Sequence, residues 1–182
     1  MKELSLNILD IAENSVKAEA TLTEITIDET DAALTLIIKD DGCGMSEQTL
    51  RSVTNPFYTT RTTRSVGLGI PLLKMSAEQT GGYVEITSKQ EDPVSSEHGT
   101  EVVAHFNKNH IDFTPLGDVI STVKTLIQGH PDTDFLFTHK RFGNEVTLDT
   151  RAMREILGEV PLDSYEVIKW IEEYLEEQYN SI

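Results

Sequence analysis

A row of polar side chains lies on the first predicted helix of this 182-residue chain. Asp10 and Asn14 are four residues apart and project from one helix face, and Glu13 and Lys17 flank them at three-residue spacing. A carboxylate, an amide and an ammonium in one row suit a metal with phosphates, because Mg²⁺ prefers hard oxygen ligands and Lys supplies positive charge. A polar helix face in water is the alternative.

A second group of residues, Asp40-Asp41-Gly42-Cys43-Gly44-Met45, directly follows an apolar segment. Glycines let the chain turn sharply and let a ligand touch the backbone, and a buried carboxylate here can accept a hydrogen bond from an exocyclic amine. A simple Asp-Gly turn is the alternative. The lone Cys43 has no partner thiol, so we interpret it as a small space-filling residue rather than a redox centre.

A third group, Gly67-Leu68-Gly69, begins a predicted helix, where unpaired backbone N–H groups and the helix dipole favour a phosphate. Arg61 and Arg64 lie just upstream in a Thr-rich segment that we interpret as a mobile lid. Arginines beside glycines in an acidic chain indicate an anionic ligand, with solvated loop arginines as the alternative. A fourth group, Gly99-Thr100, begins a strand from which Thr100 could reach a nucleotide or simply start the strand.

Hydrophobic periodicity predicts the elements that must position these groups. Apolar residues at spacings of three and four indicate amphipathic helices, and short apolar or alternating runs indicate strands. The first part is predicted to contain helices over 3–19 and 68–79, strands over 24–28, 33–39, 83–88 and 100–106, and a loop over 46–66.

A polar segment, Asn107–His110, follows a predicted strand and precedes Thr114-Pro115-Leu116-Gly117. It predicts a boundary between a domain at 1–110 and an extension at 111–182. Asp163, with Glu166 three residues later, is predicted to cap the last helix, whose acidic run we interpret as a solvated face. The extension is predicted to contain a helix over 116–128, a hairpin of strands over 134–140 and 145–149, and a short helix over 151–157 before that last helix.

Composition and charge exclude several classes of function. Lys and Arg total 15 against 31 Asp and Glu, a net charge of -16 without a basic run, so nucleic acid is not an expected partner. The apolar stretches are strand-length, so no membrane span is predicted. A single cysteine and the absence of an export-signal pattern at the N-terminus predict a cytoplasmic location.

The order of the four groups resembles that of the GHKL ATPase superfamily, which comprises histidine-kinase catalytic domains, Hsp90-type chaperones, type II topoisomerases and mismatch-repair ATPases. The resemblance covers about residues 3–107, and Asn55–Arg61 is similar to the lid entry of bacterial histidine kinases. It implies an α/β (α+β) two-layer sandwich, with a mixed sheet and helices on one face, followed here by a small α+β extension. The Gly-Lys-Ser/Thr sequence of a P-loop is absent.

The resemblance also implies roles for the matching residues. Asn14 would coordinate Mg²⁺ that bridges the phosphates of ATP, and Lys17 would contact phosphate. Asp40 would receive the adenine amino group, and Thr100 would support the adenine pocket. The other implied nucleotide-binding residues are Gly42, Gly44, Met45, Arg61, Arg64, Gly67, Leu68 and Gly69.

Two departures from the resemblance bear on activity. Hydrolysing members usually carry Glu four residues before the asparagine, whereas this chain has the shorter Asp10, which we rank ahead of Glu13 as the catalytic carboxylate. No helical hairpin with a phosphoacceptor histidine precedes the first helix, so autophosphorylation is not expected.

The sequence therefore predicts an Mg-ATP-binding domain that performs slow ATP hydrolysis or phosphoryl transfer to a separate protein. The main alternative is a nucleotide-gated regulatory module without chemistry, which Asp10 in place of Glu favours. A third hypothesis is a vestigial nucleotide site beside an interaction domain. The segment Asp10–Ala18 and the extension are also similar to short ATP-binding proteins associated with iron hydrogenases, which would imply a regulatory or maturation partner.

Overall fold

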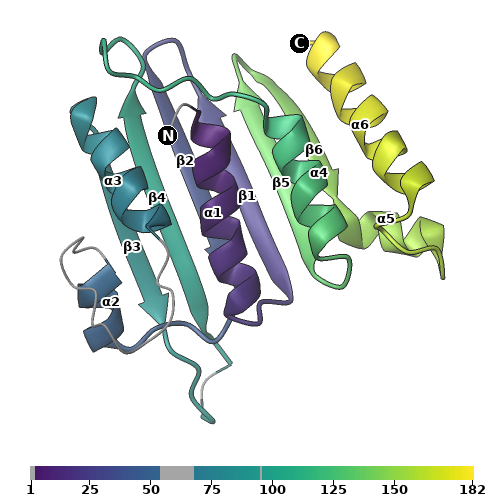
Figure 1. The fold of residues 1–182 in the computed structure, drawn as a ribbon, viewed down its shortest axis with the longest axis horizontal. Helices are drawn as coiled ribbons and strands as arrows, with labels where there is room; N and C mark the ends of the chain where they lie inside the picture. The colour runs from purple at the N-terminus through teal and green to yellow at the C-terminus, as the bar shows by residue number, and fades with distance from the viewer. Residues whose placement is uncertain (1–2, 54–67, 95) are drawn as a thin grey trace.

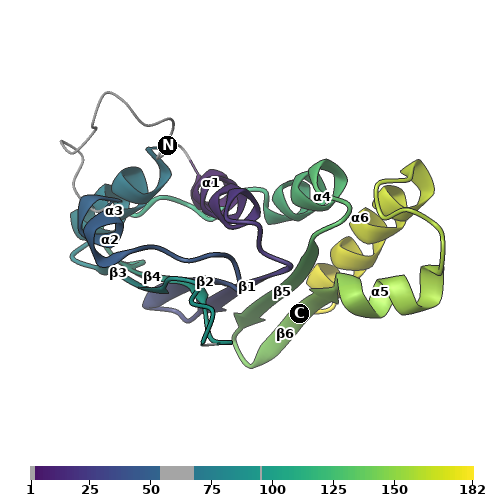
Figure 2. The ribbon, with the colours of Figure 1, turned by 90° about the horizontal axis from the view of Figure 1, so that it is seen from below.

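The computed structural model describes residues 3–53, 68–94 and 96–182, and its strands form one mixed sheet of six. The strand order is β3-β4-β2-β1-β5-β6, and helices α1, α3, α4 and α6 lie over one face of this sheet (Figures 1 and 2). This arrangement confirms the predicted fold class. None of the helices within the described ranges is both long enough and apolar enough to cross a membrane.

The first part of the chain supplies one half of the sheet and the helices above it. Strand β2 pairs antiparallel with β1 on one side and with β4 on the other, and α1 lies across them with Ile8 and Ile11 buried. The elements are α1 (Leu4–Lys17), β1 (Leu22–Glu29), β2 (Ala33–Asp40), α2 (Glu47–Val53), α3 (Gly69–Gln79), β3 (Tyr83–Lys89) and β4 (Gly99–Asn107).

The extension continues the same sheet. Strand β5 pairs in parallel with β1 over eight residues, from Leu22 opposite Asp134 to Glu29 opposite Arg141. The cores on both sides of residue 110 are therefore continuous, with Phe137 of β5 buried in the same cluster as the β1 side chains. The elements are α4 (Val119–Gly129), β5 (Asp134–Arg141), β6 (Asn144–Asp149), α5 (Thr150–Leu157) and α6 (Tyr165–Asn180).

Two local predictions differ from the structure. The polar segment predicted as a loop contains α2, a two-turn helix in which only Val53 is buried. The N-cap of α6 is Ser164 rather than Asp163, and no side chain provides a capping hydrogen bond there. Since Ser164 already has extended backbone dihedrals, the helix begins one residue later than the Asp163–Glu166 spacing predicted.

Candidate functional site

A cavity of about 230 Å³ lies between α1, α2, α3 and the adjoining ends of β2 and β4. Its apolar wall includes Ile11, Ile38 and Val102, which suits the faces of a flat heterocycle. Six residues predicted from the sequence meet at this cavity: Asn14, Lys17, Asp40, Gly44, Met45 and Thr100.

The carboxylate of Asp40 is held at the end of β2 by three donors. The backbone N–H groups of Gly42 and Thr100 donate to Oδ1 at 3.0 and 3.2 Å, and the hydroxyl of Ser15 donates to Oδ2 at 2.7 Å. A carboxylate has about four acceptor positions, so Oδ2 keeps room for one further donor. Asp40 also lines the cavity, and it is therefore placed to accept a hydrogen bond from a ligand amine.

The turn after Asp40 requires glycine at two positions. A Cβ on Gly42 would lie 2.7 Å from the carbonyl oxygen of Ala18, so only glycine lets the turn pass α1 this closely. Gly44 has φ +65°, and a Cβ there would lie 2.0 Å from the carbonyl oxygen of Lys89. Cys43 is exposed, and its N–H donates to the Ala18 carbonyl. The turn is thus packed between α1 and the end of β3.

The amide of Asn14 and the ammonium of Lys17 line the cavity without a hydrogen bond or ion pair to any of the described residues. Both come from α1, whose last turns lie beside the Asp40 turn (Figure 1). A neutral amide oxygen and a free ammonium are the donor set that suits one Mg²⁺ ligand and one phosphate contact. These two residues therefore fit the metal and phosphates of a nucleotide.

Asp10 is exposed and does not line this cavity, although it lies on the same helix. A Cβ on Gly69 would lie 3.1 Å from the Cβ of Asp10, so the N-terminus of α3 meets α1 at this residue. Gly69 itself is buried, whereas Leu68 is 63% exposed. The predicted phosphate-binding helix end and the predicted catalytic carboxylate are thus neighbours, while Leu68 and Gly42 are not part of the cavity wall.

Glu13, the second candidate for the catalytic carboxylate, has another partner. Its Oε1 atom lies 2.7 Å from Nε2 of His130, at the C-terminal cap of α4. This contact turns Glu13 toward the extension. Gly67, Arg61 and Arg64, together with the predicted lid, lie outside the described residues.

Several residues of the site were not predicted. Ser15, on the buried face of α1, is 2% exposed and donates a hydrogen bond to Asp40. Ser88 accepts from the N–H of Met45 at 2.8 Å and lies 2.9 Å from the hydroxyl of Thr100. A serine within a buried helix face was the available signal for Ser15, but nothing in the sequence indicated that β3 would bring Ser88 here.

Asp41 does not line the cavity, and its carboxylate is bonded at the start of β1. The N–H groups of Thr21 and Leu22 donate to its Oδ1 at 2.7 and 2.9 Å. Burial alone would raise the pKa of Asp41, but these hydrogen bonds outweigh it and hold the pKa below its ordinary value. The adjacent carboxylates thus divide their roles, because Asp41 bonds to the start of β1 whereas Asp40 lines the cavity.

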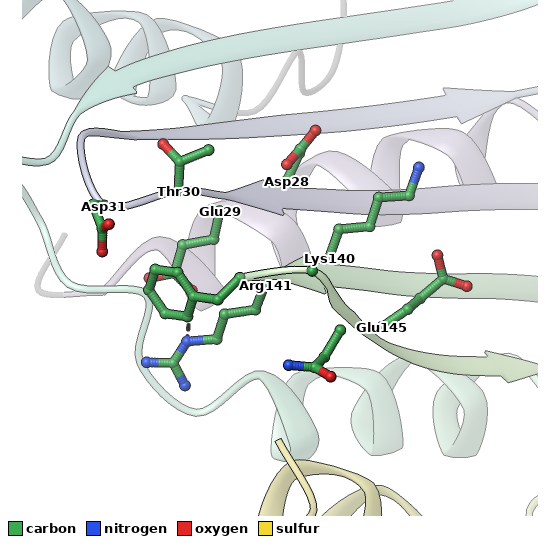
Figure 3. A pocket seen from close by; sticks show the side chains of 10 residues that line it. Asp28, Glu29, Thr30, Asp31, Lys140, Arg141 and Glu145 are labelled. Carbon is green, nitrogen blue, oxygen red and sulfur yellow. Dashed lines mark ion pairs between the residues drawn. The ribbon is translucent and has the colours of Figure 1, made fainter.

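A second hollow, of about 430 Å³, lies at the opposite end of β1, between the β1–β2 turn and the β5–β6 hairpin (Figure 3). It contains no residue of the predicted site. Beside it, Glu29 accepts from Lys108 at 2.7 Å and pairs with Arg141 at 3.4 Å. Burial opposes ionisation of Glu29, but these cations lower its pKa below the ordinary value. Ionised Glu29 therefore links β1 to the extension through its ion pair with Arg141.

Comparisons with known proteins bear on the fold and the family of this chain. The sensor protein SrrB of Staphylococcus aureus is 32% identical over 94 residues, which are 49% of this chain and 16% of that protein. The N-terminal domain of a DNA repair protein superposes with a TM-score of 0.59 at 12% identity, covering 82% of this chain and 53% of that one. The MutL ATPase domain of Aquifex aeolicus complexed with ADP superposes with a TM-score of 0.51 at 16% identity, covering 99% of this chain and 70% of that one.

The two solved structures share the fold with this chain, including its extension, and the chain spans only a small part of the curated relatives it matches. The similarity to iron-hydrogenase-associated proteins is not borne out by these matches. Residues 2–110 match the model of the family described as histidine kinase-, DNA gyrase B- and HSP90-like ATPase. The chain belongs to this family and carries its ATP-binding domain.

Proposed function

We propose that the chain binds Mg-ATP in the 230 Å³ cavity and that its activity is slow hydrolysis or transfer of the terminal phosphoryl group to a separate protein. The observation that carries the proposal is the free acceptor position on Oδ2 of Asp40, at the end of an apolar cavity. Adenine presents an amine there, whereas guanine would present a carbonyl oxygen, which a carboxylate repels.

The phosphates would extend from the adenine toward α1 and the start of α3. Asn14 would hold Mg²⁺, which supplies charge neutralisation on the phosphate oxygens, and Lys17 would add a second positive charge. Helix α3 begins at Gly69, and the positive end of its dipole would favour the negative charge of the phosphates. Arg61, Arg64 and Gly67 remain predicted phosphate contacts.

Asp10 is the proposed catalytic residue because it lies where α3 meets α1. In hydrolysis it would accept a proton from the attacking water while the water oxygen bonds to the terminal phosphorus and the bond to ADP breaks. Its short side chain limits its reach, so we expect slow turnover without a partner. The proposed location is the cytoplasm, where reducing conditions would keep the exposed thiol of Cys43 in its free form.

Nucleotide turnover by the full chain and by Asp10→Asn and Asn14→Ala tests this proposal. We expect Asp10→Asn to bind ATP normally but to lose turnover by about 100-fold, and Asn14→Ala to lose Mg-dependent binding. Glu13→Gln is the matched control, since His130 already engages that carboxylate. Equal turnover in all four proteins would exclude the mechanism.

The second candidate function is a nucleotide-gated binding module without chemistry. The position of Asp10 outside the cavity wall favours it. Calorimetry that detects ATP binding, with no ADP formed in the presence of Mg²⁺, would select this function over hydrolysis.

A further inference from the structure

The end of α5, the turn after it and the start of α6 carry three large apolar side chains that are exposed to water. Ile156 is 86% exposed, Val160 is 49% exposed and Tyr165 is 76% exposed. These residues belong to the segment 155–166, which we name the α5–α6 corner. The corner projects beyond the β6 edge of the sheet, away from α2 and α3 (Figures 1 and 2). Its apolar surface therefore lies far from the nucleotide site.

Four carboxylates neighbour these apolar residues in the sequence of the corner: Glu155, Glu159, Asp163 and Glu166. All four residues are exposed, the segment contains no Lys or Arg, and none of the four forms an ion pair with the part of the chain that the structure describes. The nearest cations in sequence have other partners, because Arg154 pairs with Asp134 and Lys169 pairs with Glu173. The corner is therefore an acidic surface with its charge unbalanced.

The corner is also anchored rather than loose. Leu162, in its middle, is 1% exposed, and Val167 of the following turn is 5% exposed. Within the corner, the N–H of Val160 donates to the carbonyl of Leu157, and the N–H of Ser164 donates to that of Pro161. A surface held in this way needs little ordering when a partner binds.

We propose that the α5–α6 corner docks a protein partner through a basic amphipathic segment, with Lys or Arg beside apolar side chains. The carboxylates would steer and orient the partner, and burial of Ile156 and Tyr165 would supply most of the affinity. A second copy of this chain does not fit, because four unpaired carboxylates would face four others. The proposal stands on the corner alone and does not depend on nucleotide binding.

Selection from a displayed library of random sixteen-residue peptides against the full chain tests the proposal. We expect enrichment of peptides with net positive charge and apolar residues at three- and four-residue spacing. Calorimetry with the enriched peptides, made by synthesis, should then show that the double substitution Ile156→Ser, Tyr165→Ser weakens binding by about tenfold or more. The triple substitution of Glu155, Glu159 and Glu166 by Gln should weaken binding by about tenfold at low salt and less at high salt.

Matched variants control for the overall charge of -16. The triple substitution Glu19→Gln, Asp31→Asn, Glu85→Gln removes the same charge elsewhere. The double substitution Val94→Ser, Ile111→Ser removes apolar groups that are 93% and 94% exposed. Both control proteins should bind the peptides like the wild type. The proposal fails if no peptide is enriched, if the enriched peptides lack basic residues, if the controls weaken binding equally, or if sedimentation shows self-association that the Ile156→Ser, Tyr165→Ser protein loses.

Discussion

The hydroxyl of Ser15 lies 2.7 Å from Oδ2 of Asp40, which joins the helix that carries Asn14 to the strand end that carries the proposed adenine acceptor. The bond fixes the rotamer of Asp40 together with the N–H groups of Gly42 and Thr100. The metal-binding and base-binding parts of the proposed site are therefore held in one hydrogen-bonded unit.

Asp40→Asn should weaken ATP binding by about 10- to 100-fold. The amide group can turn its own NH₂ donor toward the adenine amine, and it replaces a charged acceptor by a neutral one. Calorimetry with ATP measures the effect. Asp41→Asn is the control, since that carboxylate bonds to Thr21 and Leu22 outside the cavity. It should lower stability and leave ATP affinity nearly unchanged, and the opposite pattern would contradict the assignment of Asp40.

Gly44→Ala should destabilise the fold, because the new Cβ would overlap the carbonyl of Lys89 in addition to the cost of φ +65°. Gly81→Ala is a matched control with φ +76° and no atom within 4 Å of the added Cβ. The control should cost only about 1–2 kcal/mol in urea unfolding. Equal losses in the two proteins would show that the contact with Lys89 is unimportant.

His139 predicts a specific pH dependence of stability. It is 2% exposed, with Nε2 at 3.1 Å from Glu29 and Nδ1 at 2.8 Å from Tyr179. Burial lowers its pKa below 6.5 despite the neighbouring carboxylate, so the folded state binds fewer protons than the unfolded state. Stability should therefore fall as the pH decreases below about 6.5, by at most about 1.4 kcal/mol per pH unit for this group.

Urea unfolding between pH 7.5 and 5.5 measures this slope. Above pH 5 the carboxylate of Glu29 stays ionised, since its own pKa is lowered from 4.5, and it does not add to the slope. His139→Gln should flatten the dependence, whereas His110→Gln, at an exposed position, should keep it. A slope in His139→Gln as steep as that of the wild type, or steeper, would contradict the assignment.

Gln178 protects the outer edge of the sheet. Its side chain donates to the carbonyl of Thr147 at 3.0 Å and accepts from the N–H of Thr147 at 3.1 Å, as a neighbouring strand would. Gln178→Ala should cost about 1–2 kcal/mol and promote concentration-dependent association through β6. Light scattering and urea unfolding test this, with Gln128→Ala as the exposed control. Unchanged behaviour of Gln178→Ala would show that α6 itself covers the edge.

Local patterns predicted most elements, and long-range contacts account for what was missed. The apolar run of β2 and the spacing in α1 identified both within a few residues. Helix α2 was missed because only Val53 is buried, so it leaves no apolar stripe. The role of Ser88 and the parallel pairing of β5 with β1 depend on segments far apart in sequence, for which periodicity carries no signal. Asp40 and Asn14 were predicted from residue type and order, and the structure places both at one cavity.

The pairing of β5 with β1 has a practical consequence for protein engineering. Cutting the chain after residue 110 would strip β1 of the eight backbone positions that it shares with β5. The shortened protein would expose to water the core surface that Phe135 and Phe137 cover in the full chain. It would also offer the unpaired edge of β1 as a template for aggregation. Transplanting the nucleotide-binding part into a chimera therefore requires that its host supply a replacement strand at this edge.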